Sequence, residues 1–350
     1  MKKTTITLLT ATLSLISTGL TAEIDWDRAK ELRRKMQNGQ TLSEEDSAYL
    51  KTAMEARAAG KPSRSNTTRG DGSDEVATVA PVNVSEEDSP VQMLSVTASD
   101  GYKLEIAYRA PKADRPLPAV IFIHGSLGNR RLHELVDNVT NGPTPTRFLA
   151  AGYIAVCGTF RTYGEEPQSR GPILDSIAIV QAVKKLPEVD SENVIIFGTS
   201  GGGSIALELA GSPDADPLAV IAGEPASVLF SGVMTGIANR ESSMKDYPTL
   251  YTDELREIME RKIAAISCPI LIHHGDRHPL KNINFDLIFP TIEAAGKSLR
   301  IENYPGEDHG FYWGNRTSTE TVEKVLRSSL DFIEPLLTSK PEPGESRDSR

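Results

Sequence analysis

Cysteine and basic residues are both scarce in this sequence, and each shortage narrows what the chain can be. Lysine and arginine number 38 against 48 aspartates and glutamates, which gives a formal net charge of −10. Proteins that bind nucleic acid usually present a basic face, so this balance argues against a nucleic-acid partner. It also disfavours a general affinity for anionic membrane surfaces.

The chain has only two cysteines, Cys157 and Cys268, and both lie in apolar, strand-like runs. The predicted fold places them on different strands. We therefore expect two buried thiols that behave as small apolar residues, and no disulfide between them.

Long apolar runs are also missing, apart from a short one near the N-terminus. Lys2 and Lys3 precede an uncharged stretch from Ile6 to Leu20, and Thr21 and Ala22 then offer small residues for cleavage. A membrane span needs about 20 apolar residues, more than this run supplies. Residues 1–22 are therefore predicted to be a signal peptide for export to the periplasm or the extracellular space, with no stable membrane insertion after its removal. A retained single anchor is the alternative.

Composition changes along the chain predict its organisation. Residues 23–59 carry alternating charges that are typical of solvated helices, although a docking role for this helical segment stays open. Residues 60–90 are rich in Gly, Pro, Ser and acidic residues and are predicted to be a flexible linker. Residues 338–350 resemble them and form a predicted disordered tail. The region between, 91–337, has the texture of a globular domain.

Within 91–337, short apolar runs alternate with helical stretches. From residue 119 onward the strand-like runs are apolar throughout, as expected for strands that helices cover on both faces. Strand, helix and strand in repetition predict a mostly parallel α/β sheet, and the tight turn at 99–101 adds an antiparallel edge. The predicted strands are 91–98, 102–108, 119–124, 153–160, 193–198, 217–223, 268–274 and 298–304, and the predicted helices 144–151, 172–186, 201–211, 252–265, 285–296 and 318–337.

A G-x-S-x-G motif provides the candidate nucleophile, Ser200. The motif alone is weak, but here it directly follows an apolar strand and begins a helix of small residues. Such a tight strand-to-helix turn presents the serine hydroxyl on a helix N-terminus at the sheet edge. A phosphate-binding turn would instead need G-x-G-x-x-G or a Gly-Lys-Ser/Thr ending, and neither is present.

Two backbone N–H groups are candidates for an oxyanion hole. One belongs to Gly201, directly after the nucleophile, and the other to Ser126 in the loop HGSLG after the third strand. Together they would stabilise a tetrahedral oxyanion. We expect the His124 ring to brace this loop, in preference to a direct role in proton transfer.

The candidate base is His309, in a glycine-containing loop after the last strand. The order Ser, acid, His along the chain fits this position. The acid is less clear. Asp276 follows the seventh strand and is preferred, Glu224 at the end of the preceding strand is the reserve, and Asp308 is too close in sequence to orient its neighbour well.

The same region contains histidines that could form a metal site instead. His273, His274, Asp276 and His278 lie close together in sequence. Strand alternation, however, directs His273 and His274 to opposite faces, so we expect no metal.

These motifs together resemble the α/β-hydrolase superfamily, and within it the dienelactone hydrolase and prolyl oligopeptidase (S9) catalytic-domain branch. The segments that carry the resemblance are HGSLG, FRTYG at 160–164, VDSENVIIFGTSGGG at 189–203, SCPILIHHGD at 267–276 and YPGEDHGF at 304–311. The resemblance implies an eight-stranded sheet, a Ser-Asp-His triad, no cofactor, and hydrolysis of an ester or peptide bond through an acyl-enzyme.

Two features depart from that branch. The position at which it usually carries the triad acid is occupied here by His278. The chain is also too short before residue 91 for the propeller that full-length prolyl oligopeptidases use to filter substrates. The choice between ester and peptide substrates depends on the shape of the pocket, so both stay open. The first departure leaves a non-catalytic binding protein on the same scaffold as a rival.

Residues 226–263 lie between the sixth and seventh strands and are long enough for a lid. Phe230, Met234, Tyr247, Tyr251 and Met259 would either line an acyl pocket or pack the insertion onto the sheet. An apolar pattern does not distinguish the two. The sequence thus predicts a serine hydrolase acting on a small ester or a peptide.

Overall fold

The computed structural model describes residues 25, 28, 32, 43–59, 80–163, 169–236 and 239–337. Its contacts divide the chain into two units, residues 1–75 and 76–350. The predicted signal peptide (1–22), the predicted tail (338–350) and most of the predicted linker (60–79) lie outside the described residues. No helix within the described ranges is long and apolar enough to cross a membrane.

In the first unit the structure describes the helix α2 (Glu44–Ala59), which lies inside the segment predicted to be helical. Ser43 begins it as expected of a capping residue, because its Oγ accepts the N–H of Asp46 at 3.1 Å. Leu32 and Leu50 are buried, and Arg28 pairs with Asp46 at 2.9 Å.

The second unit is built on an eight-stranded sheet with the order β1-β2-β4-β3-β5-β6-β7-β8. Its first two strands form an antiparallel hairpin and β2 pairs antiparallel with β4, while all pairings from β4 to β8 are parallel. This confirms the predicted mostly parallel α/β-hydrolase sheet. The strands are β1 (Val91–Thr97), β2 (Lys103–Arg109), β3 (Leu117–Ile123), β4 (Ile154–Gly158), β5 (Val189–Thr199), β6 (Ala219–Gly223), β7 (Ile270–Gly275) and β8 (Leu299–Tyr304).

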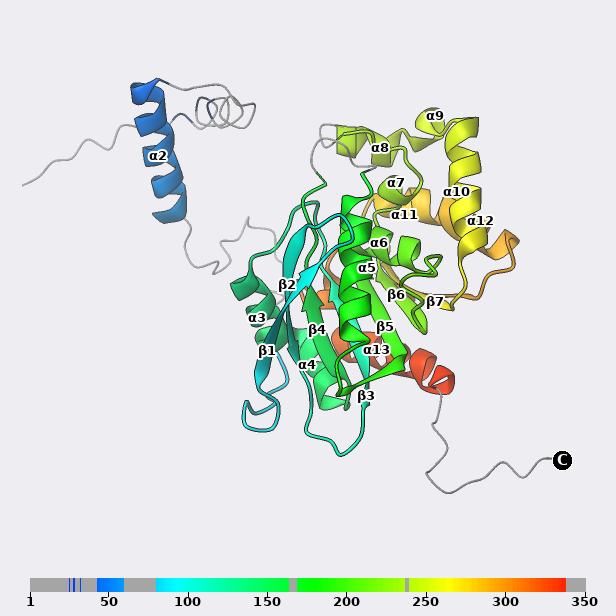
Figure 1. The fold of residues 1–350 in the computed structure, drawn as a ribbon. Helices are drawn as coiled ribbons and strands as arrows, with labels where there is room; N and C mark the ends of the chain where they lie inside the picture. Colours follow the sequence, from blue (N-terminus) through cyan, green and yellow to red (C-terminus); the bar gives the residue numbers. More distant parts are fainter. Residues whose placement is uncertain are drawn as a thin grey trace, which may run out of the picture. The chain divides into compact units, whose positions relative to one another are not determined.

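Helices cover both faces of this sheet, which explains why its central strands are apolar at every position (Figure 1). Alternate residues of β3 belong to separate cores: Ile121 packs with the α5 and α6 side, and Phe122 with the α3, α4 and α13 side. The helices around the sheet are α3 (Leu132–Asn141), α4 (Pro143–Ala150), α5 (Gly171–Val183), α6 (Gly201–Leu209), α11 (Leu280–Ile283), the π-helix η2 (Asn284–Ile288), α12 (Phe289–Ala294) and α13 (Thr319–Ile333), with short 3-10 turns η3 (Phe311–Trp313) and η4 (Glu334–Leu336).

Helix α3 was not predicted from the sequence. Its residues include Val, Thr and two Asn, which are poor helix formers, and Glu134 stabilises its first turn by accepting the Arg131 N–H at 2.8 Å. Leu135 and Val139 then bury one face of the helix against the sheet. Tertiary packing therefore overrides a weak local preference.

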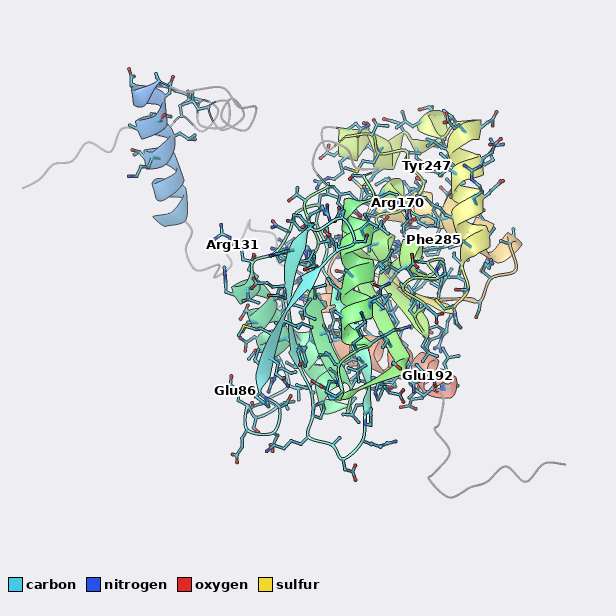
Figure 2. All side chains as sticks on the ribbon, in the orientation of Figure 1. Glu86, Arg131, Arg170, Glu192, Tyr247 and Phe285 are labelled. Atoms are coloured by element: carbon cyan, nitrogen blue, oxygen red, sulfur yellow. The ribbon has the colours of Figure 1, made fainter. Side chains whose placement is uncertain are left out.

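The described part of the insertion between β6 and β7 (residues 224–236 and 239–269) contains four α-helices above the carboxyl ends of the strands. They are α7 (Ser227–Phe230), α8 (Arg240–Lys245), α9 (Tyr247–Leu250) and α10 (Asp253–Ala265). Figure 2 places Tyr247 and Phe285 at this end of the sheet and Glu192, near the start of β5, at the other. Ligands bind at the carboxyl ends of strands in open α/β sheets, so the insertion covers the expected site.

The two cysteines are confirmed as buried thiols. Cys157 lies within β4 and Cys268 precedes β7, and neither forms a disulfide. Burial raises the pKa of Cys268 to about 12, so its thiol is protonated and unreactive at neutral pH.

Candidate active site

Ser200 lies on a strained turn between β5 and α6. Its φ of 51° and ψ of −113° are unusual for a residue other than glycine. The turn is held from two sides, because the Ser200 N–H donates to Gly223 O at 2.9 Å and its carbonyl accepts the Ala226 N–H at 2.8 Å. A Cβ at Gly198 would lie 2.2 Å from the Gly202 carbonyl oxygen, so the turn needs glycine there. Strain that the surroundings maintain is characteristic of functional sites.

The HGSLG loop packs directly against this turn. A Cβ on Gly125 would lie 3.2 Å from Ser200 Cβ, and one on Gly201 would lie 2.3 Å from Ser126 O. Ser126 itself has a φ of 78°. The two residues predicted to supply oxyanion donors, Gly201 and Ser126, are therefore neighbours beside the Ser200 side chain.

His124 braces the HGSLG loop, in agreement with the prediction. Its Nδ1 contacts Gly125 O at 2.6 Å, its Nε2 contacts Thr159 Oγ1 at 3.1 Å, and its ring stacks on Phe160 with centroids 4.4 Å apart. Burial lowers the pKa of His124 to about 4. A neutral, doubly hydrogen-bonded imidazole suits a structural part.

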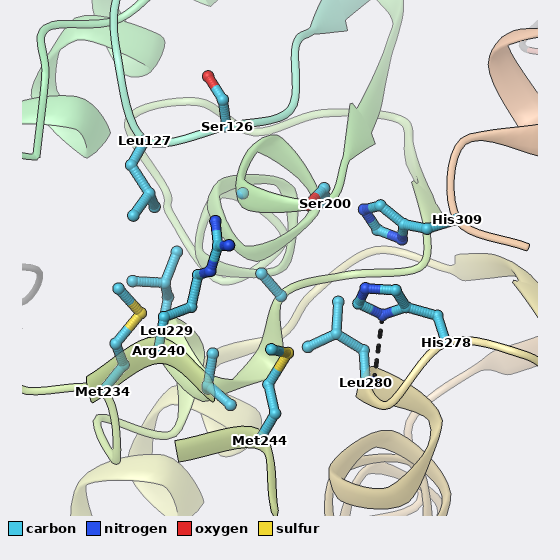
Figure 3. A pocket seen from close by; sticks show the side chains of 13 residues that line it. Ser126, Leu127, Ser200, Leu229, Met234, Arg240, Met244, His278, Leu280 and His309 are labelled. Carbon is cyan, nitrogen blue, oxygen red and sulfur yellow. Dashed lines mark hydrogen bonds between the residues drawn. The ribbon is translucent and has the colours of Figure 1, made fainter. Parts of the chain in front are cut away.

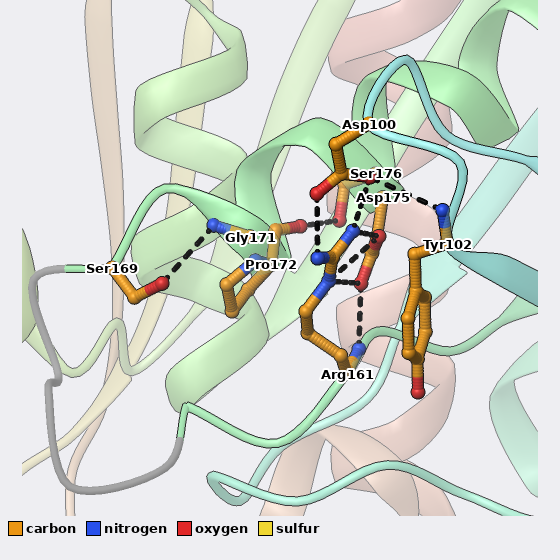
Figure 4. Close-up of polar contacts among 8 residues, drawn as sticks. All are labelled: Asp100, Tyr102, Arg161, Ser169, Gly171, Pro172, Asp175 and Ser176. Atoms are coloured by element: carbon orange, nitrogen blue, oxygen red, sulfur yellow. Dashed lines mark hydrogen bonds and ion pairs between the residues drawn. The ribbon is translucent and has the colours of Figure 1, made fainter.

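The loop after β4, which supports the HGSLG loop, is fixed by Arg161. The Arg161 guanidinium pairs with the fully buried Asp175 at 2.6 Å and with Asp100 at 2.6 Å, and it lies 4.2 Å above the Tyr102 ring (Figure 4). Arg161 holds the pKa of the Asp100 carboxyl at about 2. The arginine in the FRTYG segment therefore joins the loop to both α5 and the β1–β2 hairpin.

His309 projects from the loop after β8 into the same cavity as Ser200. The two side chains line one pocket, and Figure 3 shows the imidazole beside Ser200. The loop turns at Gly306 and Gly310, whose φ values are 83° and 99°. The predicted nucleophile and the predicted base therefore meet above the same end of the sheet.

The carboxylate at His309 is that of Glu224. Its Oε2 lies 2.7 Å from His309 Nδ1, and the Glu224 side chain is fully buried. The contact is short but poorly aligned for a hydrogen bond, and neither atom has another hydrogen-bond partner within the described ranges. Oε1 of Glu224 accepts the Gly275 N–H at 3.2 Å. A carboxylate in this position favours the imidazole tautomer whose Nε2 can accept a proton.

Backbone strain at Glu224 gives its side chain this direction. Its φ is 41°, and its N–H donates to His273 O at 2.9 Å. The next carbonyl, of Pro225, accepts from Asn284 Nδ2 at 3.1 Å, and the same amide group contacts His274 Nε2 at 2.9 Å. Asn284 begins the π-helix η2, a rare element that often marks functional sites.

Asp276 does not contact His309, and the preferred assignment of the acid is corrected. Its exposed side chain accepts the Gly306 N–H at 2.9 Å, so it ties down the loop that carries His309. Asp308 bonds the backbone N–H of His309 at 2.7 Å. The physical reason is side-chain direction: Asp276 has already left β7 for solvent, whereas Glu224 still points inward from the end of β6.

Sequence reasoning named Glu224 as the reserve and overlooked Asn284 and His274 as its supports. A carboxylate directly after a fully apolar strand was a usable signal, because burying a charge requires a partner. Asn284 gave no comparable signal, since its contacts depend on the π-helix geometry.

The pocket shared by Ser200 and His309 has a volume of about 240 Å³. Its walls are mostly apolar and come from the HGSLG loop, the nucleophile turn and the insertion (Figure 3). The lining residues are Ser126, Leu127, Ser200, Gly201, Ala226, Val228, Leu229, Met234, Arg240, Met244, His278, Leu280 and His309. Of the five insertion side chains considered from the sequence, Met234 lines the pocket, whereas Phe230 and Met259 are buried in the core.

The two adjacent histidines within β7, His273 and His274, point to opposite faces of the sheet. His273 contacts Tyr304 Oη and Ser329 Oγ, both at 2.9 Å, on one face of the sheet, while His274 contacts Asn284 on the other. In the described part of the chain no three His, Cys, Asp or Glu side chains gather as a metal site would require.

Comparisons with known proteins agree with this fold. A family model described as the dienelactone hydrolase family matches residues 106–337, which bears out the resemblance seen in the motifs. A puromycin hydrolase is similar in structure with a TM-score of 0.55 at 20% identity, covering 71% of this chain and 39% of that one. This chain thus spans about two fifths of that protein's length.

Two further solved structures have the same fold. A thermostable carboxylesterase cloned from a metagenomic library has a TM-score of 0.52 at 18% identity, covering 71% of this chain and 90% of its own. The acylaminoacyl peptidase of Pyrococcus horikoshii has a TM-score of 0.55 at 18% identity, covering 74% and 43%.

Proposed function

The chain belongs to the dienelactone hydrolase family, and from that premise we propose that it is a serine esterase whose catalytic residues are Ser200, His309 and Glu224. One observation carries the proposal: a serine on a strained turn shares a pocket with an imidazole that lies 2.7 Å from a buried carboxylate. Nucleophile, base and orienting group are recognised by such geometry and not by their order in the chain.

The proposed reaction is acyl transfer to water. Ser200 Oγ attacks the carbonyl carbon of the ester while its proton passes to His309 Nε2, and Glu224 stabilises the resulting imidazolium. The N–H groups of Gly201 and Ser126 receive the negative charge on the carbonyl oxygen. His309 then protonates the leaving alcohol, and a water molecule releases the acid from Ser200 by the same steps.

The size and polarity of the pocket favour a small ester. A volume of about 240 Å³ with walls of Leu, Val and Met fits a short acyl chain better than a peptide. The buried carboxylate of Glu224 beside His309 also argues against the alternative of a non-catalytic binding protein. That alternative rested only on the histidine at the usual position of the acid.

A fluorophosphonate probe tests the nucleophile. We expect covalent labelling of the purified protein that is lost in Ser200→Ala and kept in Ser204→Ala, the next serine along α6 and a matched control. Labelling that persists in Ser200→Ala would remove the proposal. Turnover of short acyl esters but not of the corresponding peptide amides would separate esterase from peptidase.

Export through cleavage after Ala22 is a second, separate part of the proposal. It is supported by the charge and apolar pattern of residues 1–22. The expected result is a mature N-terminus at Glu23 in protein recovered outside the cytoplasm. An intact Met1 on the exported protein would contradict cleavage.

A further inference from the structure

A second imidazole lies against the proposed base, and the reaction described above does not use it. His278 lines the pocket with Ser200 and His309. Its ring stacks on that of His309 with centroids 4.2 Å apart and an angle of 26° between the planes. The residue is half-buried, so one edge of its ring is open to the cavity.

The hydrogen bonding of His278 determines where its proton is. Nδ1 accepts the backbone N–H of Leu280 at 3.2 Å, so this nitrogen carries no proton. Burial, and after it the neighbouring His309, lower the pKa of His278 to about 4, although the carboxylates of Glu224 and Asp308 act in the opposite direction. At neutral pH the ring is therefore neutral, and its single proton is on Nε2.

The direction of that N–H follows from the ring position. Figure 3 shows the Nδ1 side of His278 turned toward Leu280 and the other ring nitrogen turned toward the pocket beside Ser200. In the proposed reaction His309 protonates the leaving group, which must therefore lie against the His309 ring. The His278 ring stacks on His309 and its Nε2 faces the same pocket, so this donor lies close to the place that the leaving group must occupy.

We propose that His278 is a substrate-binding residue whose Nε2–H donates to an oxygen in the leaving group, and that the preferred substrates are esters with a hydrogen-bond acceptor separated from the scissile oxygen by one or two carbon atoms. The inference rests on the proposed esterase function and deepens it. A bound plain alkyl leaving group would shield this N–H from water without pairing it, which disfavours that substrate and gives the site its discrimination.

A matched pair of substrates tests this directly: 2-methoxyethyl butyrate and n-butyl butyrate, whose leaving groups differ by one oxygen in place of a methylene. The measured quantity is the ratio of their kcat/KM values. His278→Phe keeps a flat ring against His309 but has no donor, and His278→Gln keeps a donor without the ring. Met244→Leu, on the apolar wall, is the control and should change both esters alike.

We expect His278→Phe to lower the ratio about tenfold and His278→Gln to keep part of the preference. An unchanged ratio in His278→Phe would overturn the inference. Equal losses on both esters would also overturn it, because they would assign the residue to packing against His309 alone. Ser200-dependent turnover of n-butyl butyrate reports separately on the proposed function.

A second measurement does not depend on turnover. In protein labelled with ¹⁵N-histidine, long-range ¹H–¹⁵N spectra distinguish the two neutral tautomers, and His278→Phe identifies the signal. A proton on Nε2 with Nδ1 as acceptor, maintained through neutral pH, is the expected result. A proton on Nδ1, or a ring that is charged at neutral pH, would contradict the proposal.

Discussion

The carboxyl ends of β6 and β7 lie side by side, and each is followed by an acidic residue. Glu224 follows β6 directly, is fully buried and lies 2.7 Å from His309. Asp276 follows β7, is exposed and accepts a backbone N–H of the loop that carries His309. Both carboxylates thus serve His309, one by facing its ring and the other by holding its loop. The direction and the burial of each side chain, and not the strand that it follows, determine which of these two roles the carboxylate has.

The largest effect that would sharpen this comparison is expected for Glu224→Gln. Loss of the carboxylate removes the stabilisation of the protonated base, which should lower kcat by about 10³- to 10⁴-fold. Asp276→Asn, the matched control on the neighbouring strand, should lower it only a few-fold, because the amide oxygen can still accept the Gly306 N–H. Steady-state rates on a short acyl ester measure both, and the reverse order would refute the assignment.

The next largest effect is expected from moving the acid from the end of β6 to the loop after β7. The ring of His278 now occupies the space against His309 on the β7 side. In the double variant Glu224→Gln/His278→Asp a carboxylate returns to that side, and we expect it to recover at least about tenfold of the lost rate.

A double variant no faster than Glu224→Gln would show that only β6 can place an acid at His309. In the otherwise unchanged protein, His278→Asp should not raise the rate, since two carboxylates would then compete for one imidazole.

The fold was predictable from the sequence, and so was the position of Ser200 and His309 at the same end of the sheet. A hairpin turn predicted β1 and β2, and apolar runs predicted β3 to β8. Motif context predicted Ser200 and His309, which line one pocket in the structure. The acid was not ranked correctly, because the strained φ at Glu224 and the outward turn at Asp276 arise from three-dimensional contacts. Helix α3 was missed for a similar reason: packing of Leu135 and Val139, and not local propensity, makes it a helix.

A smaller effect concerns the glycine that lets the two strand ends and the His309 loop approach one another. A Cβ on Gly275 would lie 2.5 Å from Glu307 O and 3.1 Å from Glu224 Oε1. Gly275→Ala should therefore lower the free energy of unfolding by about 1–3 kcal/mol and reduce kcat as well. Gly236→Ala, where a Cβ meets nothing within 4 Å, is the control. Urea denaturation compares them, and equal stabilities would contradict the close approach.

The last effect concerns the opposite face of β7 and the stability of the fold, not the rate of the reaction. Burial lowers the pKa of His273 from 6.5 to about 3, so the unfolded chain takes up a proton in this window that the folded chain does not. The contribution of the neutral His273 to the free energy of unfolding should have its full value above pH 6.5. It should fall as the pH drops from 6.5 toward 3.

In His273→Gln that dependence on pH should be weaker, whatever the change in absolute stability. His133→Gln, which replaces an exposed side chain, is the matched control. Denaturation curves across the window measure the slope, and the same slope in His273→Gln and the wild type would contradict the account.

The contact between His309 and Glu224 is open to direct observation by proton NMR. An imidazole N–H that donates to a buried carboxylate gives a strongly downfield signal. We predict this signal for His309 Nδ1–H in the wild type and in Asp276→Asn once a bound substrate analogue has aligned the contact. The signal should be absent from Glu224→Gln. A signal that survives in Glu224→Gln and disappears in Asp276→Asn would contradict the account, because it would show that Asp276, after β7, orients the His309 ring.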